Sequence, residues 1–115
     1  MLDKKNFIKK VNDLGSLIGF SVEDTSIENY INSAILRNKG TRQEIHVFNG
    51  HYGKENKISI QGELSGIKIN ELLPCIHIAE TKTAEQIKKD IDRHLMPSYM
   101  LILKKALADQ RKVSE

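Results

Sequence analysis

Apolar residues recur at helical spacing near the start of the chain. They form one stripe that consists of Phe7, Val11, Leu14 and Ile18. Asp3 stands just before this stripe and can cap the first turn of a helix. Gly15 and Gly19 weaken its end, because glycine is a poor helix former. The pattern therefore predicts a helix over about residues 3–17.

The segment that follows supports two interpretations. Its apolar residues fit a helical stripe, and Thr25 with Glu28 can form a capping box. The same residues also alternate as they would in a strand. Residues 38–40 then read "NKG", a good hairpin turn, and residues 43–48 alternate in the manner of a strand. Since a strand before such a turn and a strand after it form a consistent pair, we favour a strand over a helix for residues 29–37.

Two later runs also have the period-two alternation of strands, over residues 57–64 and 75–80. The glycine-containing residues 50–56 predict a loop before the first of these runs. With the strands on either side of the turn, the pattern predicts an antiparallel meander of about four strands. Such a sheet has an apolar face that another element must cover.

The last third of the chain changes to a helical period. Thr83 is a good N-cap, and apolar residues follow at helical spacing. Pro97 lacks the N–H that a helix interior needs, but it fits the first turn of a new helix. We therefore predict a single α+β domain over residues 1–115, in which two C-terminal helices, kinked at Pro97, pack on one sheet face. The alternative is a single helix with a sharp kink at His94–Met96. The first helix has the stripe Ala84, Ile87, Ile91 and Leu95, and the second has Met100, Leu103, Ala106 and Leu107.

Charge and composition limit the cellular setting. The net charge is +3, and the excess lies in residues 81–115, which carry eight Lys or Arg against five acidic residues. Such a mild bias favours a solvated helix face, since nucleic-acid-binding proteins often have a stronger one. Cys75 is the only cysteine, so we expect a reducing, cytoplasmic setting. The apolar runs are too short to span a bilayer, so no membrane partner is expected.

The residues capable of metal or acid–base chemistry are scattered. On a strand Cys75 and His77 would share one face, but a zinc site needs three or four converging ligands. We favour a Cys75 that lines the core and a hydrogen-bonded His77. His46 and His51 flank the "VFNG" turn without adding a ligand pattern, and no recognised catalytic motif occurs. We therefore predict no enzyme, no catalytic residue, no metal and no cofactor.

One segment resembles a known group of proteins. Its pattern "EQIxxDIxRxLxPxY" is similar to the C-terminal part of small proteins from bacteriophages and conjugative elements, and to a domain of large polyvalent phage proteins. The pattern comprises Glu85, Gln86, Ile87, Asp90, Ile91, Arg93, Leu95, Pro97 and Tyr99. His94 stands where the group usually has Arg. The resemblance implies no chemistry, but it implies a mobile genetic element whose small cytoplasmic proteins act on host defence or on nucleic acid.

These observations lead to two expectations about function. The favoured one is a non-enzymatic mobile-element protein that inhibits a host defence protein or ribonucleoprotein by protein contact, as anti-CRISPR proteins do. The alternative is a small nucleic-acid-binding accessory protein. A sheet with edge strands also allows a homodimer. The residues expected to contact a protein are His51, Tyr52, Lys54 and Arg42, and those expected to contact nucleic acid are Lys88, Lys89, Arg93, Lys104 and Lys105.

Overall fold

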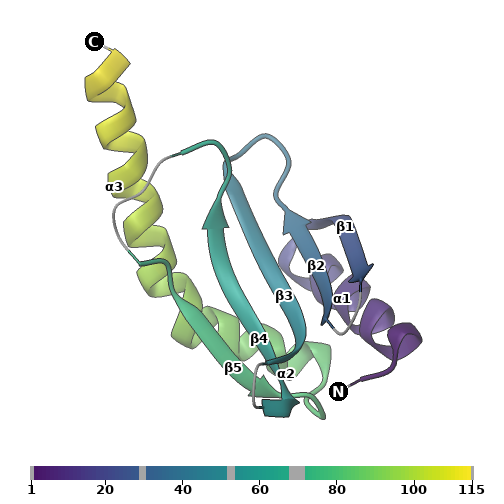
Figure 1. The fold of residues 1–115 in the computed structure, drawn as a ribbon. Coiled ribbons are helices and arrows are strands. Elements are labelled where there is room, and N and C mark those ends of the chain that lie inside the picture. Colours follow the sequence, from purple (N-terminus) through teal and green to yellow (C-terminus); the bar gives the residue numbers. More distant parts are fainter. Residues whose placement is uncertain (1, 29–30, 52–53, 68–71, 115) are drawn as a thin grey trace.

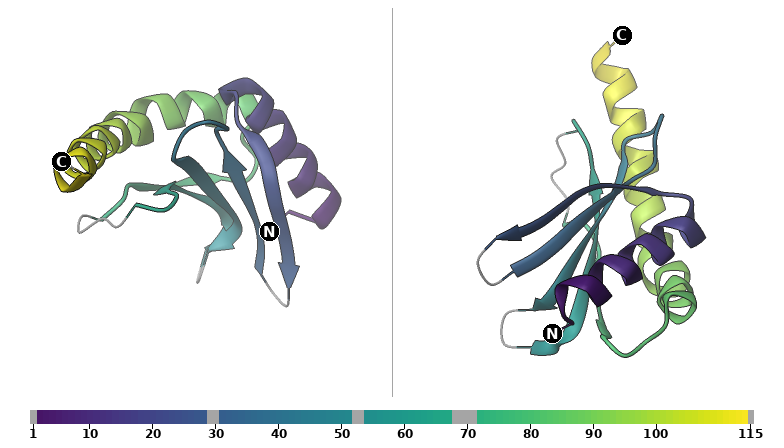
Figure 2. Two further views of the ribbon diagram at one scale, coloured as in Figure 1. Left: turned by 90° about the horizontal axis from the view of Figure 1, so that it is seen from above. Right: turned by 90° about the vertical axis from the view of Figure 1, so that its right-hand side faces the viewer.

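The computed structural model describes residues 2–28, 31–51, 54–67 and 72–114 as an α+β fold (Figure 1). The elements follow in this order: α1 (Lys4–Ile18), β1 (Ser21–Glu28), β2 (Ile31–Arg37), β3 (Gln43–His51), β4 (Lys54–Leu64), β5 (Cys75–Ala79), α2 (Ala84–Asp90), the π-helical segment η1 (Ile91–Leu95) and α3 (Met96–Ser114). The strands form one sheet in sequence order, and each neighbouring pair is antiparallel. All the helices lie on one side of this sheet (Figure 2). The predicted fold class is confirmed.

The sheet has five strands rather than the predicted four, because β1 was missed. Its sequence, SVEDTSIE, is mostly polar, and the register shifts between Val22 and Asp24. A shift of this kind interrupts the period of two on which the prediction relied. Thr25 and Glu28, considered as a capping box, lie in this strand.

The preferred strand interpretation of residues 29–37 is confirmed for residues 31–37 by β2, whereas residues 29–30 lie outside the described residues. The turn after it is also as expected. Gly40 has a φ of 82°, and the Asn38 N–H donates to the Gln43 carbonyl at 3.1 Å. The loop predicted over residues 50–56 is wrong in extent, because β3 continues to His51 and β4 begins at Lys54. A left-handed Gly50, with a φ of 85°, lies at the bulge that lets β3 continue.

The predicted division into two helices at Pro97 is wrong. The helical run continues from Ala84 to Ser114, and Pro97 is the second residue of α3. Directly before it, η1 widens the helix, and the Met96 N–H donates to the Ile91 carbonyl five residues back. In a regular helix the proline ring would collide with the carbonyl four residues earlier. The wider π-helical turn therefore accommodates Pro97 without ending the helix.

The π-helical segment also explains how the helical run keeps one side toward the sheet. Its buried residues recur every four positions: Ile87, Ile91, Leu95, Tyr99 and Leu103. In a regular α-helix, residues four apart drift around the axis by about 40° at each step. Because a π-helical turn holds more residues, η1 counteracts this drift.

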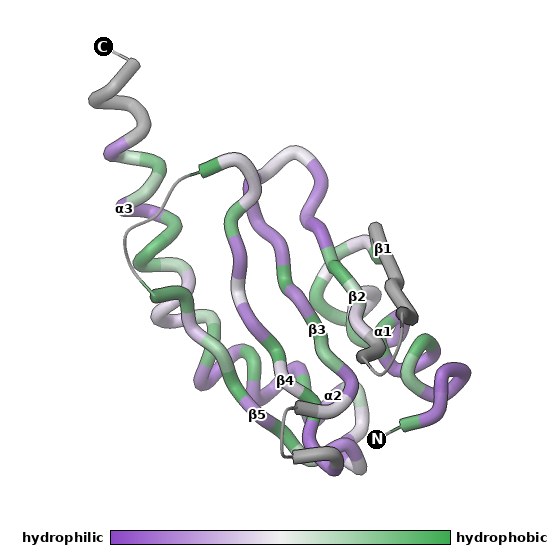
Figure 3. The backbone as a smooth tube through the Cα atoms, viewed as in Figure 1, coloured by the Kyte–Doolittle hydropathy of each residue, from purple (hydrophilic) through white to green (hydrophobic). Residues whose placement is uncertain are grey.

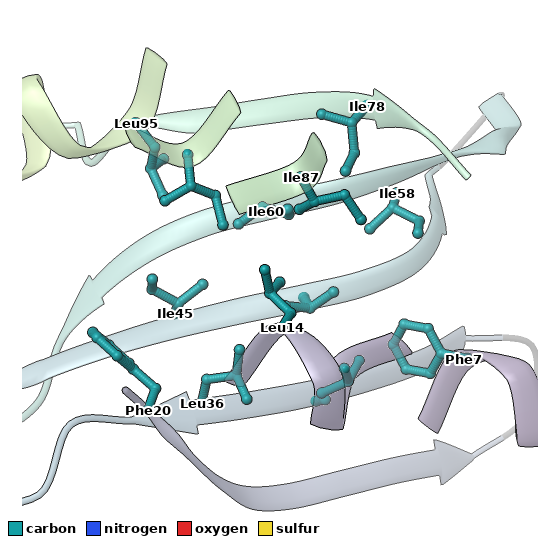
Figure 4. Close-up of a cluster of buried hydrophobic side chains, with 14 residues drawn as sticks. Phe7, Leu14, Phe20, Leu36, Ile45, Ile58, Ile60, Ile78, Ile87 and Leu95 are labelled. Atoms are coloured by element: carbon teal, nitrogen blue, oxygen red, sulfur yellow. The ribbon is translucent and has the colours of Figure 1, made fainter. Parts of the chain in front are cut away.

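The core lies between the helices and one face of the sheet (Figure 4). Hydrophobic and hydrophilic residues alternate along β3 and β4 (Figure 3), so that every second side chain meets the helices. The predicted stripe of α2 and η1 is confirmed as buried. In the predicted α1 stripe Phe7, Val11 and Leu14 are buried, whereas Ile18 is only partly buried. The central cluster comprises Phe7, Val11, Leu14, Phe20, Ala34, Leu36, Ile45, Val47, Ile58, Ile60, Ile78, Ile87, Ile91 and Leu95. None of the described helices lies over the opposite face of β2–β5, which we call the open face.

A second, smaller cluster joins α3 to the ends of β3 and β4. The Tyr99 ring lies against Gly62, where an added Cβ would come within 2.4 Å of the ring. The Tyr99 hydroxyl accepts from the Glu44 N–H at 3.2 Å and donates to the Glu63 carbonyl at 2.6 Å, so it bridges two strands. Burial, together with the charges of Glu44 and Glu63, raises the Tyr99 pKa to about 12, although the hydrogen bond from the Glu44 backbone opposes the shift.

Candidate functional site

The four residues expected to contact a protein do not form one compact site. Arg42 lies at the β2–β3 turn, where its carbonyl accepts from the Ser65 N–H at 2.8 Å. His51 and Lys54 lie at the other end of β3 and β4, and Tyr52 is outside the described residues. A strand as long as β3 separates its two ends by roughly 30 Å. A single small partner surface therefore does not reach all of them.

The basic residues expected to contact nucleic acid lie along the outer side of the C-terminal helical run. Lys89 and Arg93 are exposed, whereas Lys88 pairs with Asp92, with 2.8 Å between Nζ and Oδ2. Asp90, spaced to pair with Arg93, binds Lys82 at 2.6 Å. Acidic residues thus accompany the cations in the first half of this run.

The second half of the run also carries an acidic residue, Asp109, four residues after Lys105, but it differs in its exposed apolar side chains. Residues 97, 101, 104, 105 and 108 are all exposed, and a helix of 3.6 residues per turn places them on the side opposite Tyr99. Leu101, with 71% of its surface exposed, is at their centre, and the two lysines stand on either side of it. We call this surface the α3 outer strip, and it consists of Pro97, Leu101, Lys104, Lys105 and Ala108.

Further apolar surface adjoins the α3 outer strip. Met100 and Leu107 are 45% and 38% exposed, so the second predicted stripe is only partly buried, with Leu103 as its buried residue. Tyr99, which was not part of that stripe, is also buried. On the side of the α3 outer strip away from Met100 and Leu107, a groove of about 490 Å³ separates α3 from the segment before β5. It is lined by Gln61, Leu72, Leu73, Pro74, Cys75, Ser98 and Ile102. Leu72, 94% exposed, forms part of its rim. The large exposed hydrophobic side chains therefore concentrate around α3.

Sequence reasoning missed Leu101 and Leu72. On a helical wheel Leu101 falls on the side that carries the lysines. An apolar residue on that charged side was the signal that could have identified it. Leu72 belongs to a connecting segment, where periodicity carries no information about exposure. The last turns of α3 project beyond the end of the sheet, as Figure 1 and the right-hand view of Figure 2 show. A sequence pattern does not indicate where a helix extends beyond the sheet on which it packs.

The Cys75 and His77 predictions have different outcomes. Cys75 is exposed, so the core-lining interpretation is wrong, because alternation along β5 turns Ile76 and Ile78 toward the helices. Partial burial nevertheless raises the pKa of its thiol. His77 is hydrogen-bonded as expected, with 2.8 Å between its Nδ1 and the Ser59 Oγ. Within the described ranges, no group of three or more potential metal-ligating side chains comes together.

The comparisons with known proteins find no relative. No family model matches the chain, and neither the curated proteins nor the solved structures give a match. The resemblance to proteins of mobile genetic elements therefore stays a prediction. Within the described part of the chain, no helix combines the length and the apolar character required to cross a membrane.

Proposed function

We propose that the protein is a non-enzymatic binding protein that contacts an acidic, partly apolar protein surface through the α3 outer strip. The observation that carries the proposal is Leu101, a largely exposed leucine between Lys104 and Lys105. An apolar anchor within a charged rim is the usual composition of a protein interface. The lysines complement acidic groups on the partner and increase the association rate.

A protein partner is favoured over nucleic acid by the side chains that surround the lysines. Proteins that bind single strands combine cations with exposed aromatic rings on which bases stack. The aromatic residue of α3, Tyr99, is fully buried, whereas its exposed neighbours are aliphatic. Aliphatic side chains gain little from contact with a phosphate backbone, but they gain from burial against a protein.

The resemblance to phage and conjugative-element proteins suggests the kind of target. We propose that the partner belongs to a host defence complex in the cytoplasm, and that the protein inhibits it by covering one of its surfaces. The groove beside α3 can receive a partner side chain, because Leu72 and Ile102 give it apolar walls. The projecting end of α3 makes the strip accessible to a large complex.

A cross-linking experiment tests this proposal. A photoreactive phenylalanine analogue at position 108 would be exposed to a nuclease-treated lysate of a bacterial host with the defence system. We expect one predominant cross-linked protein, and we expect Leu101→Asp to remove it. Leu17→Asp is the matched control, because Leu17 is an exposed leucine on α1.

The control variant should retain the cross-link. If Leu101→Asp captures the same protein as the unmodified chain, the α3 outer strip is not the binding surface. If capture disappears only on nuclease treatment, and gel shifts show binding to nucleic acid that weakens steeply with salt, the nucleic-acid alternative replaces this proposal.

A further inference from the structure

The open face has an apolar centre with partly exposed side chains. Ile35 on β2 lies directly opposite His46 on β3, and Phe48 follows two residues later on the same face. The His46 and Phe48 rings are tilted by 56°, with 6.5 Å between their centroids. None of the described helices lies over this face of the sheet (Figure 2). A sheet face of this composition gains free energy when a second layer covers it.

The charges on the open face are separated along the strands. Glu44 and Glu63 lie directly opposite each other on β3 and β4, at one end of the face. Lys57 lies on the same strand and the same face as Glu63, six residues away, which corresponds to about 20 Å. Arg37 partly compensates the acidic end, because its Nη2 lies 2.5 Å from the Glu44 Oε2. Glu63 accepts from the neutral side-chain amide of Gln61 at 2.9 Å.

This arrangement is complementary to itself. Consider a two-fold axis that lies between two open faces and runs perpendicular to the strands. Such an axis sets β4 of one copy over β4 of the other in the reverse direction. Glu63 of each copy then lies over Lys57 of the other, and Phe48 lies over His46. The row of paired residues Val47 and Ile60, whose side chains face the helices, lies midway, so His46 and Phe48 of the open face stand on either side of the axis.

We propose that the open face packs against the open face of a second copy, as two aligned sheets that form a symmetric dimer. The two layers lie about 10 Å apart, as in other stacked sheets. Each Lys57–Glu63 contact occurs twice, as two-fold symmetry requires. The dimer leaves both α3 outer strips on its outside, so it is independent of the proposed function.

Sedimentation equilibrium over a range of concentrations tests the proposal with charge reversals. We expect the unmodified protein to dimerise, and we expect Lys57→Glu and Glu63→Lys each to raise the dimer Kd at least about tenfold, because each sets like charges together twice. A mixture of the two variants should dimerise again, since one copy then contributes two glutamates and the other two lysines. Lys5→Glu on α1 is the matched control and should leave the Kd unchanged.

Thermal unfolding followed by circular dichroism checks that each variant is folded. An unmodified protein that stays monomeric at every concentration overturns the proposal. A dimer that tolerates both reversals also overturns it, because its interface then lies elsewhere. Recovery in the mixture cannot come from misfolding or from a general change in net charge, so it is the decisive result.

Discussion

The same strands form both faces of the sheet, yet the two faces differ in the kinds of residues that they carry. The covered face carries aliphatic residues that meet the helices, and its polar groups are bonded, as the Tyr99 hydroxyl demonstrates. The open face combines Ile35 and Phe48 with two opposing glutamates, a pairing that disfavours the folded monomer. Burial of aliphatic side chains therefore accounts for the residues of the covered face, whereas the stability of one chain does not account for the opposing glutamates of the open face.

The largest expected effect comes from truncating the same residue type on each face. Ile60→Ala on the covered face should lower the free energy of unfolding by about 3–4 kcal/mol, because Ile60 is fully buried and its loss leaves a cavity. Ile35→Ala on the open face should cost the monomer only about 1 kcal/mol, because water already reaches this partly exposed side chain. Chemical denaturation of dilute samples measures both values. Equal losses would show that the open face is a second core.

The covered face was the part of the molecule that the sequence predicted well. Its alternating isoleucines and the stripe from Ala84 to Leu95 give a clear period, so both the fold class and the side of the sheet followed from them. The preferred division into two helices at Pro97 was wrong, because a proline was expected to begin a new helix. The spacing of four from Ile87 to Leu103 was a usable signal for a π-helical turn.

The candidate surfaces were predicted much less well. Residues expected at one binding site lie at opposite ends of β3, because strand length, not closeness in sequence, fixes their separation. The α3 outer strip depends on where the helix leaves the sheet. The charge separation on the open face depends on the register that sets Glu44 opposite Glu63. The register between strands and the length by which a helix extends beyond a sheet are set by tertiary structure. The periodicity of the sequence therefore does not predict them.

A smaller effect should come from Tyr99→Phe, which removes the bridging hydroxyl from the covered face. We expect a loss of about 1–2 kcal/mol, because the Glu44 N–H and the Glu63 carbonyl each lose a buried partner. The pH dependence adds a specific signature. The Tyr99 pKa is about 12 in the folded protein and near 10 when unfolded, so the unfolded chain releases its proton first as the pH rises.

The contribution of this tyrosine to stability is therefore complete below pH 10 and is lost between pH 10 and 12. Urea denaturation across that interval should show a decline in the unmodified protein that is shallower in Tyr99→Phe. The comparison with the variant is needed because lysines also titrate in this range. Parallel declines in the two proteins would mean that the tyrosine ionises equally in both states.

The smallest expected effect has the opposite sign on the monomer and on the dimer. Glu63→Gln should stabilise the dilute monomer by about 0.5 kcal/mol, because it removes a like-charge pair across β3 and β4 while the new side chain still accepts from Gln61. The same change should weaken the dimer, since it deprives Lys57 of the second copy of its counter-charge. Glu44→Gln is the informative control, and it should destabilise the monomer because it removes the ion pair between Arg37 and Glu44. Denaturation midpoints measured at low and at high protein concentration separate the two contributions. If Glu63→Gln destabilised the dilute monomer, Glu63 would stabilise the fold of a single chain. The open face would then not differ from the covered face in what its residues contribute to stability.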